Sequence, residues 1–114
     1  VNQDKVFCKD IQLECNTTGI AEERSVKIAI RPESILISQN KSNEQNCIQG
    51  TIKENEFLGS FQRLYVESPS LSEELLMIDI ANTSHTNFDL NQGSMIYFIF
   101  PPDQIKVYPN SWIF

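Results

Sequence analysis

The sequence predicts an all-β protein, folded as a small closed or nearly closed barrel of about eight short strands. In most of its apolar stretches, apolar and polar residues alternate with a period of two, which is typical of half-buried strands. Turn-forming residues separate these stretches, and no stretch has the periodicity of a helix of three turns. Short strands joined by turns favour a barrel over a parallel α/β architecture.

The stretch 26–38 shows the strand pattern most clearly. Its first half alternates, while the apolar run at 35–37 predicts a second short strand covered on both faces. Pro32 has no N–H for a strand ladder, so it predicts a corner between the two strands. Arg31 and Glu33 flank this proline. In an extended chain they would point to the same side, so we expect an ion pair at the corner.

The other elements follow in order. Residues 6–15 are expected to form one strand, and the polar segment 16–25 should lead from it into 26–38. A strand starting at 48 should end at Phe57-Leu58-Gly59-Ser60, where the glycine allows a bend or bulge, and 63–67 should return from it. After a turn at 68–74, strands are predicted at 76–80, at 95–100 (covered on both faces) and near 105–107. Phe88 and Leu90, in the polar loop 82–92, are expected to anchor that loop on the core.

The chain length of 114 residues indicates one domain, spanning 1–110, followed by a tail at 111–114. The eight polar residues at 39–46 are a long loop or an internal boundary. Three widely spaced cysteines, Cys8, Cys15 and Cys47, do not form a disulfide pattern and favour a reducing compartment. We expect neither a signal peptide nor a membrane span. Three sequons, beginning at Asn16, Asn40 and Asn82, would matter only in a secreted protein.

Catalytic chemistry has little support in the sequence. The only histidine, His85, lies in a polar loop and is expected to be solvated rather than to act as a base or a metal ligand. Glu54 and Glu56 could form a carboxylate pair, but acids near a strand end more often protect an exposed edge. The four glycines are too dispersed for a phosphate-binding loop. We therefore expect no enzyme activity, no metal and no cofactor in this chain.

Nucleic-acid binding is the alternative that a small barrel raises, because such barrels stack bases on aromatic side chains of a basic face. Phe61, Arg63 and Tyr65 imitate this pattern, but a net charge of −6 opposes binding to a polyanion. The same aromatic stripe and the apolar tail Trp112-Ile113-Phe114 predict instead that two copies of the chain pair.

Several elements together resemble a TOBE (transport-associated OB) domain, the C-terminal barrel of the ATP-binding subunits of ABC importers. They are Ile30-Arg31-Pro32-Glu33-Ser34-Ile35, then Gln49-Gly50-Thr51-Ile52 leading to Phe57-Leu58-Gly59-Ser60, then 90–93 before an apolar strand and Pro102-Asp103. The resemblance covers about 26–108 and implies an OB-like barrel. It departs from the family at Ser94, where an acidic residue is common, and before Val26, where no pattern matches.

The resemblance implies a non-catalytic regulatory and dimerisation domain of an importer for iron, polyamine, phosphonate or sugar. The nucleotide-binding domain would precede residue 1. The implied partners are a second ATPase subunit and, through the full-length protein, the permease subunits, at the cytoplasmic face of the membrane. The residues carried over as subunit contacts or as architecture are Arg31, Pro32, Glu33, Phe57, Leu58, Gly59 and Ser60. The alternatives are a barrel that binds an oxyanion or metabolite and a secreted recognition module.

Overall fold

A computed structural model of the chain describes residues 4–8, 11–15, 26–43, 45–81 and 90–109, and it confirms the all-β class. Nine strands lie in these residues, where about eight were predicted. They are β1 (Asp4–Cys8), β2 (Ile11–Cys15), β3 (Val26–Ala29), β4 (Leu36–Ser38), β5 (Cys47–Phe57), β6 (Phe61–Glu67), β7 (Leu76–Ala81), β8 (Met95–Ile99) and β9 (Lys106–Pro109). The only helical segments of this part are two 3-10 turns, η1 (Pro32–Ser34) and η2 (Pro102–Gln104).

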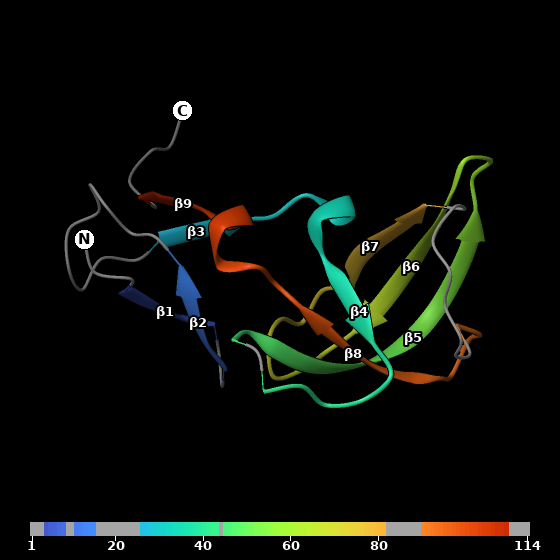
Figure 1. Ribbon diagram of the computed structural model, residues 1–114, viewed down its shortest axis with the longest axis horizontal. Coiled ribbons are helices and arrows are strands. Elements are labelled where there is room, and N and C mark those ends of the chain that lie inside the picture. Colours follow the sequence, from blue (N-terminus) through green and yellow to red (C-terminus); the bar gives the residue numbers. More distant parts are fainter. Residues whose placement is uncertain (1–3, 9–10, 16–25, 44, 82–89, 110–114) are drawn as a thin grey trace.

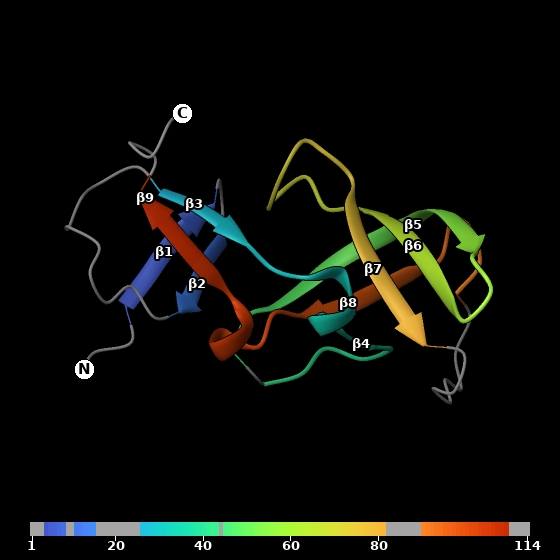
Figure 2. The ribbon, with the colours of Figure 1, turned by 90° about the horizontal axis from the view of Figure 1, so that it is seen from above.

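The strands form three antiparallel sheets. The largest has the order β4-β8-β5-β6-β7, and the other two are the pairs β1-β2 and β3-β9. Figures 1 and 2 show the two small sheets together at one end of the molecule and the five-stranded sheet at the other. The chain crosses between the two ends after β3 and again before β9. The five-stranded sheet is therefore formed by the continuous stretch 36–99, whereas the small sheets combine the beginning of the chain with its last strand.

The long strand β5 curls the five-stranded sheet into a small OB-like barrel. Its first half pairs with β8 and its second half with β6, so the 11 residues of one strand serve both sides of the sheet. The pairing with β6 shifts register between Ile52 and Glu54, and such a bulge bends a strand and increases its twist. At the open seam, η1 packs against β7 and so covers an otherwise unpaired strand edge.

One hydrophobic core joins both ends of the molecule. Its buried members from the barrel include Ile52, Leu64, Ile78, Ile96 and Phe98, and β2 adds Leu13 and Cys15 with no exposed surface. Leu90 packs against this core as predicted, whereas Phe88 lies outside the described residues. β2 therefore contributes to the core as well as to a sheet.

Gly50 is where the barrel wall is tightest. A Cβ atom at this position would lie 2.5 Å from Val66 Cγ1 and 2.9 Å from Phe98 Cε2, both far inside van der Waals contact. Only a residue without a side chain lets β5, β6 and β8 pack this closely.

The side chain of Asn46 connects the two ends through hydrogen bonds. Its Oδ1 accepts from the Glu14 N–H, while its Nδ2 donates to the carbonyl oxygens of Glu14 and Phe100, each at 2.8 Å. The Phe100 N–H donates in turn to the Asn46 carbonyl at 3.2 Å. Asn46 has a φ of 61°, a left-handed conformation that asparagine tolerates better than most residues.

The prediction of one continuous strand over 6–15 is wrong. β1 and β2 are separate and antiparallel, with Cys8 opposite Ile11 and Asp4 opposite Cys15. In the sequence, two charged residues stand between Cys8 and Ile11 and interrupt the apolar alternation. That interruption separates the two strands in the sequence.

The predicted ion pair between Arg31 and Glu33 does not form, although the structure describes both residues. The chain at Pro32 is a 3-10 turn, closed by the Ser34 N–H donating to the Arg31 carbonyl at 2.9 Å. Residues two apart on such a turn point in different directions, whereas the expectation assumed an extended chain. Pro32 fits the first helical position because its missing N–H is not needed there.

Two stretches predicted to be covered on both faces are only partly covered. Leu36 is 52% exposed because β4 is an edge strand, and Met95 at the start of β8 is 58% exposed. Ile99, the last residue of β8, and Phe100 directly after it are buried. An unbroken apolar run therefore does not show whether a strand is central or at the edge of a sheet, since edge strands also contain such runs.

Candidate functional site

The β5–β6 tip, defined as Phe57, Leu58, Gly59 and Ser60, projects apolar side chains into solvent. Phe57 is 74% exposed and Leu58 is 39% exposed, although both are large apolar residues. The Leu58 N–H donates to the Phe61 carbonyl at 2.9 Å, and Gly59 has a φ of 89°. A glycine with positive φ at the first central position suits a tight two-residue hairpin turn. The exposed pair is thus held on a turn of defined shape.

The corner formed by Arg31, Pro32 and Glu33 lies elsewhere. It is part of η1, which packs on β7, and both charged side chains are exposed. Ser34 anchors the corner through a weak hydrogen bond from its hydroxyl to Gln104 Oε1 at 3.4 Å. Figures 1 and 2 both place η1 apart from the β5–β6 tip, so the structure does not bring these two groups of predicted residues into one site.

The aromatic stripe on β6 is held in a network on the outer face of the sheet. Arg63 makes two hydrogen bonds to Asp79, from Nε to Oδ1 at 2.7 Å and from Nη2 to Oδ2 at 2.9 Å. Its guanidinium lies 5.5 Å from the centre of the Phe61 ring. The Tyr65 hydroxyl donates to Glu56 Oε1 at 3.0 Å. Arg63 and Asp79 face each other on neighbouring strands, which is why the pair can form.

This network changes the proton affinities of its members. The hydrogen bond to Asp79 raises the pKa of Arg63, and the hydrogen bond to Glu56 is the main cause of the raised pKa of Tyr65. The positive charge of Arg63 is thereby balanced within the sheet. A face of this kind offers a polyanion aromatic rings but little uncompensated positive charge.

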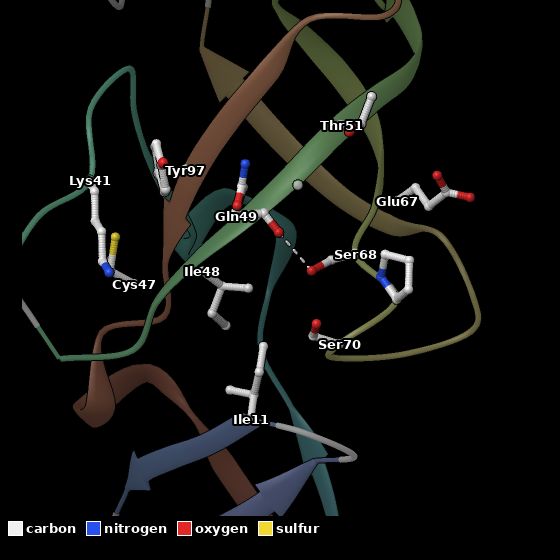
Figure 3. Close-up of a pocket in the computed structure, with 12 residues that line it drawn as sticks. Ile11, Lys41, Cys47, Ile48, Gln49, Thr51, Glu67, Ser68, Ser70 and Tyr97 are labelled. Carbon is white, nitrogen blue, oxygen red and sulfur yellow. Dashed lines mark hydrogen bonds between the residues drawn. The ribbon is translucent and has the colours of Figure 1, made fainter.

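A hollow on the outer face of β5, which we call the β5 groove, is a second candidate site (Figure 3). It is lined by residues 47–51 of β5, by the segment 67–70 at the end of β6, and by Ile11, Lys41 and Tyr97. Its volume is about 460 Å³. One wall is fixed by the buried Ser68, whose hydroxyl donates to the Gln49 carbonyl at 2.8 Å.

The β5 groove was not predicted from the sequence. Its residues come from four strands and two loops, and only the folded chain brings them together. The only feature of the sequence that pointed to this groove was the alternation of inward-facing and outward-facing residues along β5. Gln49 and Thr51 share the outer face of β5, because Ile48, Gly50 and Ile52 occupy the inner one.

The described residues contain no group of three or more His, Cys, Asp or Glu side chains that could hold a metal ion. His85 and the tail 111–114 lie outside those residues. Glu54 is exposed, and Glu56 accepts the hydrogen bond from Tyr65. In the same described part of the chain, no helix is long and apolar enough to cross a bilayer.

The fold and these surfaces place the protein in a structural class, the small OB-like barrels, with an exposed apolar hairpin. A comparison with protein-family models then matches residues 28–107 to the TOBE domain. The match covers most of the chain, so the protein belongs to the TOBE domain family. No curated protein matches the sequence. Membership in this family associates the chain with the ATPase subunits of ABC transporters or related regulators.

Proposed function

We propose that this chain is the non-catalytic regulatory and dimerisation domain of the ATP-binding subunit of an ABC importer, of the iron, polyamine, phosphonate or sugar type. The observation that carries the proposal is the TOBE match over 28–107, which includes both the Arg31 corner and the β5–β6 tip. In the full-length subunit, the barrel would lie at the cytoplasmic face of the membrane. It would contact a second ATPase subunit there, and the permease subunits through the rest of the protein.

The β5–β6 tip supports a contact with another protein. Large apolar side chains left in solvent on a tight turn cost free energy unless a partner covers them. Two such residues are too few for a stable interface alone, since specific interfaces bury about 1,200 Å² or more. The tip therefore fits a contact that works within a larger assembly.

Nucleic acid is not the partner we propose. Arg63, the cation of the aromatic stripe, is bonded to Asp79, and the whole chain carries a net charge of −6. Both features oppose binding to a phosphate backbone.

Self-association of the full-length subunit tests this function. We expect the reading frame upstream of Val1 to encode a nucleotide-binding domain, and we expect Phe57→Ser to weaken pairing of the complete subunit in sedimentation. Leu75→Ser is the matched control, because Leu75 is 50% exposed but lies outside the β5–β6 tip. An unrelated upstream domain, or equal pairing of wild type and Phe57→Ser, would contradict the proposal.

A further inference from the structure

We propose that the β5 groove binds a small polyhydroxylated molecule carrying one anionic group, such as a sugar phosphate or a sugar acid. The groove lies around the start of β5, whereas the β5–β6 tip lies at its far end (Figure 1). The inference does not rest on the proposed dimerisation, so either can fail without the other.

The size of the groove suits one small ligand. A volume of about 460 Å³ falls within the range of roughly 300–1,000 Å³ that is usual for small-molecule sites. Part of the accessible lining is apolar: the partly exposed Ile11 and the exposed Pro69 lie beside the polar groups. These surfaces can contact the carbon skeleton of a sugar.

The charges of the groove favour one anionic group. Glu67 Oε1 lies 3.7 Å from Lys53 Nζ, and this ion pair offsets the negative charge of Glu67. Lys41 has no ion pair with any other residue that the structure describes. Figure 3 shows Lys41 and Glu67 on opposite sides of the hollow, so an anionic group beside Lys41 would be away from the carboxylate. The Lys41 ammonium group provides a local attraction for an anion, and this short-range attraction acts against the long-range repulsion from the net charge of −6.

The hydroxyl groups of the groove favour a ligand with several hydroxyls of its own. Thr51, Ser70 and Tyr97 line the hollow, and none of the three side chains forms a hydrogen bond to another described residue. Each hydroxyl can both donate and accept, as sugar hydroxyls can. In Figure 3 the three come from different sides of the hollow, Thr51 and Tyr97 from two strands and Ser70 from the loop after β6. Together with Lys41, they match both parts of the proposed ligand.

Binding can be followed through the backbone amide NMR signals of 47–51 and of Glu67, Ser68 and Ser70 in the full chain. The probes are glucose 6-phosphate, gluconate, glucose and inorganic phosphate. We expect glucose 6-phosphate or gluconate to bind more tightly than glucose and than phosphate, because only the first two offer both recognised parts. Whichever of glucose 6-phosphate and gluconate binds more tightly shows whether the groove prefers a phosphate or a carboxylate group. No saturable shift with either compound, or phosphate binding as tightly as glucose 6-phosphate, would overturn the inference.

Variants separate the two parts of the ligand. Lys41→Gln should weaken binding of the better anionic probe by about tenfold, the usual effect of losing a charged hydrogen bond at a partly open site. Tyr97→Phe keeps the ring and should weaken binding by about fivefold through its lost hydroxyl. Lys106→Gln, at an exposed position of β9 outside the groove, is the charge-matched control and should bind as wild type. Equal affinity of Lys41→Gln and wild type would contradict the assignment.

Discussion

The side-chain amide of Asn46 pairs with the backbone of Glu14 as a neighbouring strand would, accepting from its N–H and donating to its carbonyl, both at 2.8 Å. A third bond, to the carbonyl of Phe100, connects β2 to the residue directly after β8. One polar residue in a loop thus holds together segments that are 32 and 54 positions away in the chain.

Removing this side chain should destabilise the protein. Asn46→Gly keeps the backbone free to adopt the φ of 61° but loses three hydrogen bonds, so we expect a loss of about 2–3 kcal/mol in the free energy of unfolding. Asn46→Ala should lose about 1 kcal/mol more, because alanine resists the left-handed conformation. Urea denaturation measures both. Equal stability of Asn46→Gly and wild type would show that the three bonds contribute nothing.

Gly50→Ala should also destabilise the barrel, by about 1–3 kcal/mol, because its Cβ would overlap Val66 and Phe98. The double variant Gly50→Ala/Val66→Ala should be less destabilised than the sum of the two single changes, since the second removes the clashing methyl group. Gly59→Ala is the control for backbone effects, as a Cβ there meets nothing within 4 Å and only the φ of 89° is unfavourable. Additive behaviour of the double variant would contradict the steric explanation.

Arg63 and Asp79 should behave as one unit. Arg63→Lys keeps the charge but cannot form both parallel bonds, so we expect a lower midpoint of thermal unfolding. In the background of Asp79→Asn, the same change should have a smaller effect, because the paired carboxylate is already gone. If the effect of Arg63→Lys is the same in both backgrounds, the two side chains are not coupled.

Tyr65 should lose its proton at a higher pH than a free tyrosine, whose pKa is 10.0, because its hydroxyl donates to Glu56. The folded chain holds this proton more tightly than the unfolded chain does. The resulting stability is therefore complete below pH 10.0 and is lost as the pH rises through the raised pKa.

The phenolate absorbance of the folded protein measures this titration, with Tyr65→Phe identifying the contribution of Tyr65. Glu56→Ala should move the Tyr65 titration back towards 10.0. An unchanged titration in Glu56→Ala would show that the hydrogen bond does not set the pKa.

Strand alternation alone was enough to predict much of the fold. The parity of Ile48, Gly50 and Ile52 located the inner face of β5, and Pro32 located the corner, because both depend on local geometry. Leu36 was misjudged, since whether a strand lies at an edge is decided by its neighbours in space. Local patterns therefore predict strands better than they predict the position of a strand in a sheet.

The candidate sites were predicted less completely. The β5–β6 tip was recognisable from Gly59 and the apolar residues before it, which are adjacent in the sequence. The groove around Lys41 and Tyr97 depends on residues that meet only after folding. The bonds of Asn46 could not be read from the sequence either, because an asparagine in a polar loop predicts only a turn.

The burial of Leu13 and Cys15 has a practical consequence for anyone expressing this domain. The family match begins at residue 28, and a truncation at that boundary would remove two side chains that have no exposed surface. It would also remove Glu14, the partner of Asn46. In a protein truncated there, the core side chains that contact Leu13 and Cys15 would be exposed to water. We therefore expect the truncated protein to aggregate, which would prevent measurement of its binding properties.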